Sequence, residues 1–340
     1  MWSSRYFIAF FVALLAALVL TPLVRLLAAK LGFLDYPDKR KKHLFPMPNL
    51  GGLAVYIALT LGIFFTFYYS HAMKVILLGG LAMLFLGMVD DKKGIPATVK
   101  VSVLLLLAFL LSRFGVMIHF FHSYVPDLLM TLFWILLVTS AINAMDNMDG
   151  LASGISAVSA ALFFIAALRT GQYLFGIISA SLSGAAIGFL PYNFKPAKIF
   201  LGNGGSFFLG FVLASIAIMG EWSEYPLISY VIPVLILSVP IFDLSFVVLW
   251  RYKKGITSSL KEAVLYSGTD HLSHRLAKLG LTERRVVVIL CLLNAGVGIG
   301  AVIALPLESF FEMGLLLFQV FIILSVLAIV INIGQEDLKK

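Results

Sequence analysis

Charged residues are scarce in this sequence. They make up 12% of its 340 residues, whereas 61% are hydrophobic and the mean hydropathy is +1.03. In soluble domains about a quarter of all residues are charged. The composition therefore excludes an ordinary soluble enzyme and indicates a polytopic membrane protein. Cysteine is nearly absent as well: Cys291 is the only one, and it falls within an apolar run. A single cysteine excludes a disulfide framework and a cysteine metal site, so we expect Cys291 to be a packing residue.

Eleven apolar windows are long enough, or nearly so, to cross a bilayer core of about 30 Å. The first lacks a signal-peptide cleavage pattern and is expected to remain as a span. Two of the others are short, which leaves ten as the alternative count. We predict an all-α, single-domain membrane protein over residues 1–340. The windows are 6–28, 51–69, 75–89, 99–112, 126–146, 151–168, 174–191, 206–220, 227–249, 286–305 and 309–332.

Basic residues alternate between the two sets of connections that these windows define. Of the 25 Lys and Arg residues, 21 fall in one set and 4 in the other. Because cytoplasmic loops of membrane proteins are enriched in Lys and Arg, the pattern predicts an external N-terminus and a cytoplasmic C-terminus. The longest polar stretch, residues 251–285, is predicted to be a cytoplasmic loop that is too short to fold alone.

Acidic residues gather on the predicted cytoplasmic side. Asp90 and Asp91 end one apolar window, and Asp146 and Asp149 end another. Adjacent acids at the C-terminal end of a helix are unfavourable, because they repel each other and meet the negative end of the helix dipole. A metal ion or the lysines that follow would offset this cost. We therefore expect these four carboxylates to form a functional site.

The stretch 140–154 interrupts the apolar pattern most strongly. If the preceding helix continues through it, Asn143, Asp146 and Asp149 recur every three residues and share one face. Such a face suits a bound cation better than a packed core. Asp243 is the one acid inside an apolar window, and we expect it to pair with Arg251 or with a polar group of a neighbouring helix.

Polar loops accompany the carboxylates on the same side. Residues 191–206 combine Asn193 and two lysines with a Gly-rich turn that opens the next helix, a pattern that favours phosphate binding. The basic loop contains three hydrogen-bond donors in one five-residue stretch: His271, His274 and Arg275. They suit a phosphate or a sugar hydroxyl. Zinc would need a third ligand there.

A basic run in the first predicted cytoplasmic loop includes Lys42 and His43. Two interpretations stay open. The run attracts anionic membrane lipids, at roughly 1 kcal/mol for each basic residue near the surface, or it captures a phosphate on a lipid or nucleotide.

In their order and common placement these motifs resemble those of the polyprenyl-phosphate N-acetylhexosamine-1-phosphate transferases. The matching segments are RKKHLFPMPNLGG, the acid pair of GMVDDKKGIPATVK with Lys100, NAMDNMDGLA, PYNFKPAKIFLGNGGS, PIFD to Arg251, and HLSHRL. The resemblance implies transfer of an N-acetylhexosamine 1-phosphate, most simply of N-acetylglucosamine, from a UDP-sugar to undecaprenyl phosphate. UMP is released, and a cell-envelope glycan begins on the bacterial plasma membrane. Nucleic acid has no part in this reaction, and the sequence leaves open whether the protein is a homodimer.

The resemblance also implies a role for each candidate residue. Asp90, Asp91, Asp146 and Asp149 are the implied catalytic residues, with Asp90 as our choice for the base that takes the proton of the lipid phosphate. Mg²⁺, or Mn²⁺ in its place, would be held by Asp91, Asp146 and Asn203. The implied substrate contacts are Lys42, His43, Lys100, Asn143, Asn193, His271, His274 and Arg275.

Three positions depart from the family pattern. Asn147 stands where the family has a glycine, and Ser273 stands where it has the middle histidine of its His-x-His-His cluster. Asn203 replaces an aspartate that the family uses toward magnesium. Asn203 keeps a carbonyl oxygen for Mg²⁺ but lacks the charge that a hard cation prefers.

Two other classes of membrane protein share some of these features. The CDP-alcohol phosphotransferases also place an Asp-Gly pair by the membrane, but they need an Ala-Arg pair after it and two further spaced acids. Here Leu151, Ala152 and Ser153 follow, and no acid appears before Glu221. A transporter of a phosphorylated or anionic substrate is the non-enzyme alternative, although transporters tend to place polar residues at mid-membrane depth.

Overall fold

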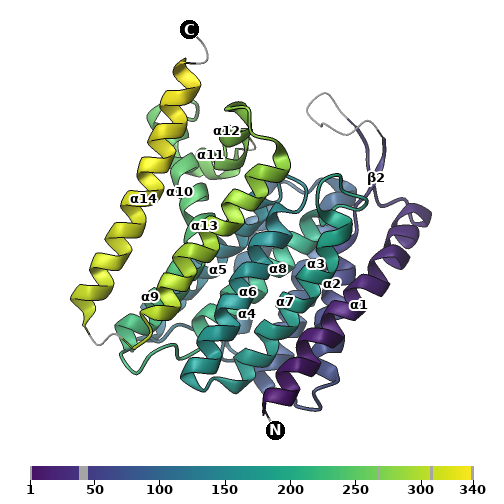
Figure 1. Ribbon diagram of the computed structural model, residues 1–340, viewed down its shortest axis with the longest axis vertical. Helices are drawn as coiled ribbons and strands as arrows, with labels where there is room; N and C mark the ends of the chain where they lie inside the picture. Colours follow the sequence, from purple (N-terminus) through teal and green to yellow (C-terminus); the bar gives the residue numbers. More distant parts are fainter. Residues whose placement is uncertain (1, 38–44, 267, 307–308, 338–340) are drawn as a thin grey trace.

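The computed structural model describes residues 2–37, 45–266, 268–306 and 309–337, and helices make up most of it (Figure 1). The helices are α1 (Trp2–Lys30), α2 (Gly51–Phe64), α3 (His71–Lys93), α4 (Ala97–Ser112), α5 (Tyr124–Met145), α6 (Leu151–Thr170), α7 (Tyr173–Asn193), α8 (Gly202–Met219), α9 (Pro226–Ile236), α10 (Ser238–Lys253), α11 (Leu260–Leu265), α12 (Leu272–Lys278), α13 (Glu283–Ile303) and α14 (Phe310–Asp337). Two short strands, β1 (Leu34–Asp35) and β2 (Met47–Pro48), pair antiparallel.

The predicted class is confirmed: this is an all-α polytopic membrane protein. Within the described residues, eight helices are long and apolar enough to cross a membrane, and the bent pair α9–α10 makes a ninth. The windows at 51–69 and 99–112 form the shorter apolar helices α2 and α4. Every predicted window therefore contains a helix, whereas the number of crossings and the side on which each terminus lies stay predictions.

The predicted span 227–249 is broken rather than straight. Its two halves, α9 and α10, meet at Leu237 with a bend of 77°. Pro240 lacks the N–H that would otherwise bond to the carbonyl of Ile236, which favours a break at this point. The Ser159 hydroxyl, from α6, donates to that carbonyl at 3.5 Å.

Helix α8 lies at the centre of the bundle, with 89% of its span buried, compared with 22% for the peripheral α14. Glycines let it approach its neighbours backbone to backbone. A Cβ at Gly87 of α3 would overlap the backbone of Asn203 and Gly204, and one at Gly52 of α2 would overlap Gly205. The end of α3, which carries Asp90 and Asp91, is thereby brought against the start of α8.

One end of the bundle gathers the polar segments. Figure 1 shows α11, α12 and the β1–β2 ribbon at the end where α1 and α14 finish. We call it the carboxylate end, because α3 and α5 also finish there with Asp91 and Asp146. The other end, where α6, α8 and α13 finish, is called the opposite end.

Candidate active site

Asp90 is buried at the end of α3, where three donors surround its carboxylate. Oδ1 accepts the backbone N–H of Ile95 at 2.9 Å, and Oδ2 accepts from Lys100 Nζ at 3.0 Å and Asn203 Nδ2 at 2.9 Å. The left-handed turn at Gly94 reverses the chain so that α4 brings Lys100 back to this carboxylate. Lys100, rather than the adjacent lysines, is therefore the cation that offsets Asp90.

Asp91 faces the start of α8. Its Oδ1 accepts the backbone N–H of Asn203 at 3.2 Å, and its Oδ2 accepts that of Gly204 at 3.5 Å. A carboxylate is favourable at a helix N-terminus, where amide groups have no partner within the helix. The Gly-rich turn was expected to offer these amides to a phosphate. Asp91 accepts from two of them instead, and Gly204 and Gly205 serve the close packing of helices.

Asn143 and Asn203 connect α5 with α8 beside the acid pair. Asn143 Nδ2 donates to Asn203 Oδ1 at 3.1 Å and to Ser206 Oγ at 2.8 Å. Through Asn203 this network continues to Asp90. Asn203 is thus the residue at which the three helices α3, α5 and α8 meet.

The 140–154 stretch does not continue as one helix. Helix α5 ends at Met145, Asp146 caps it, and a turn with Gly150 at φ 81° precedes α6. The prediction that Asn143, Asp146 and Asp149 share one helical face is therefore wrong. The turn directs Asp149 elsewhere: its Oδ2 lies 3.3 Å from Lys195 Nζ and accepts the N–H of Ala197 at 3.1 Å.

Asp146 lines a cavity at the carboxylate end. Its carboxylate makes no hydrogen bond to any other residue that the structure describes. Burial by the surrounding protein, with the charges of Asp91 and Asp149, raises the pKa of Asp146 to about 8. A cation beside it would offset that cost, since an opposite charge favours the ionised form. Asp146 is therefore the carboxylate best suited to a bound metal ion.

The metal ligands expected from the sequence combine two types of donor, carboxylate and amide oxygens. Among the described residues, no three His, Cys, Asp or Glu side chains converge as a metal site. Asp146 and Asn203 both line the cavity, and Asp91 bonds to the backbone of Asn203. Two carboxylates and one amide oxygen are donors that Mg²⁺ accepts, and Mg²⁺ in proteins retains several waters. The residues present therefore fit a magnesium ion.

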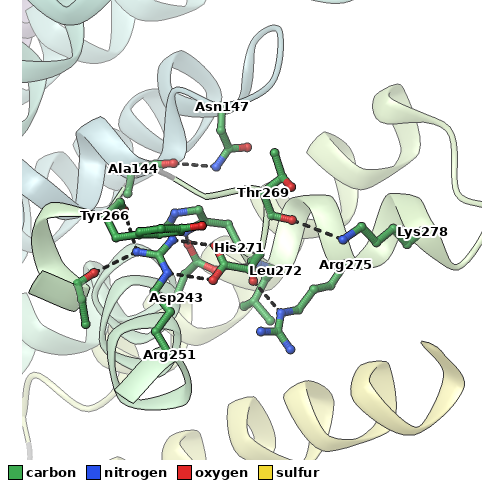
Figure 2. A network of polar contacts seen from close by, with 12 residues as sticks. Ala144, Asn147, Asp243, Arg251, Tyr266, Thr269, His271, Leu272, Arg275 and Lys278 are labelled. Carbon is green, nitrogen blue, oxygen red and sulfur yellow. Dashed lines mark hydrogen bonds and ion pairs between the residues drawn. The ribbon is translucent and has the colours of Figure 1, made fainter. Parts of the chain in front are cut away.

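The loop that contains His271 is attached to the bundle by buried polar contacts (Figure 2). Arg251, which is 1% exposed, donates Nε and Nη2 to the carboxylate of Asp270 at 2.7 and 2.6 Å. Its Nη1 donates to the carbonyls of Ala263 and Tyr266. The prediction that Asp243 pairs with Arg251 is therefore wrong. The partner of Asp243 is His271, whose Nδ1 lies 2.6 Å from Asp243 Oδ2.

The three donors predicted in this loop do not act as one cluster. His271 caps α12 and lines the cavity. His274 and Arg275 are not among the lining residues, and the guanidinium of Arg275 lies 4.3 Å from the ring centre of Trp250. Asn193 is also away from the cavity: it accepts from Ser153 Oγ at 2.7 Å and donates to the Ile199 carbonyl at 3.1 Å, which shapes its loop. Lys42 and His43 lie outside the described residues.

Two of the three family departures contact each other. Ser273 Oγ donates to Asn147 Oδ1 at 2.6 Å, which ties α12 to the turn after α5. Asn147 also lines the cavity. Sequence reasoning recorded both departures but could not pair them, because 126 positions separate them along the chain.

Several of these side chains line a cavity of about 420 Å³ at the carboxylate end, whereas Asp90, Asp91 and Asp149 are not among its lining residues. Of the predicted site residues, Lys100, Asn143, Asp146, Asn203 and His271 line it. Sequence reasoning missed Asn147 and Tyr266 as lining residues and gave Arg251 no place in the site. The lining residues are Met83, Leu86, Ala97, Lys100, Val101, Leu104, Ser140, Asn143, Ala144, Asp146, Asn147, Asn203, Phe207, Leu244, Arg251, Val264, Tyr266, Gly268 and His271.

The fold and the site define a class: a polytopic membrane protein with a cavity of cationic, acidic and amide side chains where its helices end. The family model that matches residues 73–221 is glycosyl transferase family 4. Similarity to curated proteins extends over nearly the whole chain. The chain is 33% identical to a probable undecaprenyl-phosphate N-acetylglucosaminyl 1-phosphate transferase of Bacillus subtilis, over 98% of this chain and 94% of that protein.

Two further relatives agree. A decaprenyl-phosphate N-acetylglucosaminephosphotransferase of Mycobacterium tuberculosis is 31% identical over 82% of this chain and 77% of its own length. An undecaprenyl-phosphate alpha-N-acetylglucosaminyl 1-phosphate transferase of Escherichia coli is 26% identical over 80% of this chain and 76% of its own. The chain belongs to the polyprenyl-phosphate N-acetylhexosamine-1-phosphate transferases of glycosyl transferase family 4, and it is a multi-pass protein of a bacterial membrane.

Proposed function

We propose that the protein transfers N-acetylglucosamine 1-phosphate from a UDP-sugar to undecaprenyl phosphate in a reaction that requires Mg²⁺. The cavity at the carboxylate end is the observation that carries this proposal. It brings Lys100, Asp146 and His271 together from three separate segments, where a membrane-bound phosphate and a soluble nucleotide can meet. The relatives, named for transfer of this sugar phosphate to polyprenyl phosphates, support the choice of sugar and acceptor.

In this reaction an oxygen of the lipid phosphate attacks the phosphorus that carries the sugar. The bond from that phosphorus to the oxygen of UMP breaks, and UMP leaves with the electron pair. Both reactants are anionic, so the site must reduce their repulsion and hold them in line. Lys100 and the protonated form of His271 supply donors to the cavity that both line, and Asn143 donates a hydrogen bond to Asn203.

Asp146 and Asn203, with Asp91 beside them, would hold Mg²⁺, which would offset the charge of the phosphates and of the departing UMP. We assign Asp90 a different task from the one expected. Its oxygens already accept from Ile95, Lys100 and Asn203. Asp90 therefore orients Lys100 toward the cavity instead of taking a proton from the lipid phosphate.

The test is UMP release by the purified protein given UDP-N-acetylglucosamine, undecaprenyl phosphate and Mg²⁺. The Asn203→Asp variant and an EDTA-treated sample run beside it. We expect UMP release that stops with EDTA, and a lower Mg²⁺ requirement for Asn203→Asp because the added charge favours a hard cation. UDP-N-acetylgalactosamine is the alternative donor in a parallel reaction.

Two results would contradict the proposal. One is an unchanged rate after EDTA, which would exclude the metal. The other is flux of the sugar nucleotide into liposomes that contain the protein without any UMP release, which would favour the transporter.

A further inference from the structure

Asp243 lies in α10 and is 0% exposed. Both of its carboxylate oxygens contact residues at the start of α12. Oδ1 accepts the backbone N–H of Leu272 at 2.6 Å, and Oδ2 lies 2.6 Å from His271 Nδ1. Such short contacts are typical of hydrogen bonds to a charged group. A carboxylate inside an apolar segment is costly unless it has a specific partner, so this pairing determines where the α12 segment docks.

The contact determines which ring nitrogen of His271 carries a hydrogen. A carboxylate only accepts hydrogen bonds, so the nitrogen beside it, Nδ1, must be the donor. Nε2, on the far edge of the ring, then faces away from Asp243. His271 lines the cavity, and no hydrogen bond recorded among the described residues involves its Nε2. Asp243 thus sets the ring's orientation and keeps a hydrogen on Nδ1, as second partners do for histidines in other sites.

The residues on either side of His271 are held as well. Asp270 is bound by Arg251 of α10, and Ser273 is bound by Asn147 of the turn after α5. Four consecutive residues, 270–273, therefore each have a partner outside their own segment. A ring fixed in this way loses little conformational freedom when an anionic ligand binds.

We propose that Asp243 is a positioning residue: it holds His271 with Nδ1–H on its carboxylate and Nε2 directed into the cavity, so that the imidazolium ring donates Nε2–H to the diphosphate of the sugar nucleotide. This rests on the proposed function for the identity of the ligand. The other charged groups that line the same cavity are Lys100, Asp146 and Arg251. Of these, Arg251 is bound by Asp270 and Lys100 by Asp90. A neutral ring with its hydrogen on Nδ1 can only accept at Nε2, so a contact with a phosphate needs the imidazolium form, in which both nitrogens donate. The short bond to the Asp243 carboxylate is of the charge-assisted kind that an imidazolium makes.

The experiment is a double-mutant cycle of Asp243→Asn and His271→Ala, read by calorimetric binding of UDP-N-acetylglucosamine with Mg²⁺ present. Asn keeps its one oxygen for the Leu272 N–H and then presents an NH₂ group, which cannot accept a hydrogen bond, to His271. We expect each single variant to bind roughly 10- to 100-fold more weakly, as expected for loss of a hydrogen bond to a charged group. The double variant should bind no more weakly than His271→Ala, because Asp243 acts through the ring.

Asp127→Asn is the matched control. Asp127 is also buried, at 1% exposure, and accepts backbone N–H groups of Phe121 and Ser123, but it lies at the start of α5 at the opposite end. This control should leave binding of UDP-N-acetylglucosamine unchanged. If the effects of Asp243→Asn and His271→Ala simply multiply, Asp243 only stabilises the fold and the proposal is overturned.

The ¹⁵N NMR chemical shifts of the His271 ring provide a second test that needs no ligand. The wild-type protein should show a protonated Nδ1, and Asp243→Asn should change that state; an unprotonated Nδ1 in the wild-type protein would overturn the proposal. If the wild-type protein shows the expected shifts but does not bind UDP-N-acetylglucosamine, the donor assignment fails while the positioning by Asp243 stands.

Discussion

The two ends of the bundle each contain a cavity of about 420 Å³, so size does not distinguish them. At the opposite end, Arg169 donates to the Val302 carbonyl, and the Trp222 indole donates to the Ala217 carbonyl. The acids there, Glu221 and Glu224, are exposed to solvent. At the carboxylate end, Asp146 is held in a site that disfavours its charge. Buried polar groups that are costly to charge and held in fixed positions therefore mark a functional cavity better than volume does.

The largest effect is expected from Asp146→Asn. Removal of the charge that would hold the cation should lower the rate of UMP release by about 10²- to 10³-fold, the cost of losing one electrostatic group in a preorganised site. Glu221→Gln, the matched change at the opposite end, should leave the rate within about twofold, since a surface substitution changes little. Equal effects at both ends would erase the distinction between the two cavities.

Arg251→Lys should weaken the attachment of the loop. Lysine cannot reproduce the forked contact with Asp270, and loss of one hydrogen bond to a charged group costs about 1.5–3 kcal/mol. Faster proteolysis or hydrogen exchange within residues 255–275 would register the change. Arg169→Lys at the opposite end, where the arginine is exposed and donates to Val302, should change stability by about 0.5 kcal/mol or less. A loop that stays protected in Arg251→Lys would contradict this account.

Gly87→Ala tests how the site is assembled from α3 and α8. The added methyl group would meet the backbone of Asn203 and Gly204, and overpacking costs about 1–3 kcal/mol. We expect a lower melting temperature in detergent together with reduced UMP release. Gly296→Ala is the control, because a Cβ there has no neighbour within 4 Å. A Gly87→Ala protein that melts like wild type would show that the helices can separate without cost.

The smallest effect is expected from Ser273→Ala. It removes one hydrogen bond, to Asn147, and should lower stability by about 0.5–1.5 kcal/mol. Asn147→Ala also removes the hydrogen bond from Asn147 Nδ2 to the Ala144 carbonyl. The double variant should nevertheless lose less stability than the sum of the two single variants, since both changes break the Asn147–Ser273 contact. Melting temperatures of the two single variants and the double variant provide the measurement. Fully additive losses would mean that the Asn147–Ser273 contact contributes nothing.

Much of the fold could be predicted because its signals are local. Each apolar window contains a helix, since a run of apolar residues is favoured in a bilayer whatever its neighbours are. The break at Leu237 was not predicted, although Pro233 and Pro240 stand on either side of it. A continuous apolar window conceals a bend, because lipid accepts both halves and only helix packing sets the angle between them.

The site was predicted less completely than the fold. Sequence placed Asp90, Asp91, Asp146 and Asp149 at the same end, but it could not say that Asp149 turns to Lys195. That outcome depends on the turn at Gly150, which ends the helical spacing on which the prediction relied. The sequence likewise identified the His271 loop but not its contact with Asp243. Arg251 is nearer to Asp243 in sequence and was one of the expected partners, but it binds Asp270 instead.

Residue types and their order were enough to predict a helical membrane protein and its family, and to select a few polar residues as candidates for its site. The membrane helices could be predicted because the residue types of one segment set the free energy of placing that segment in lipid. The partners of the acids depend on tertiary packing: Lys100 for Asp90, the α8 amides for Asp91, and His271 for Asp243. These pairs join separate helices and loops, so they depend on glycine contacts and turn geometry that bring distant backbone segments together.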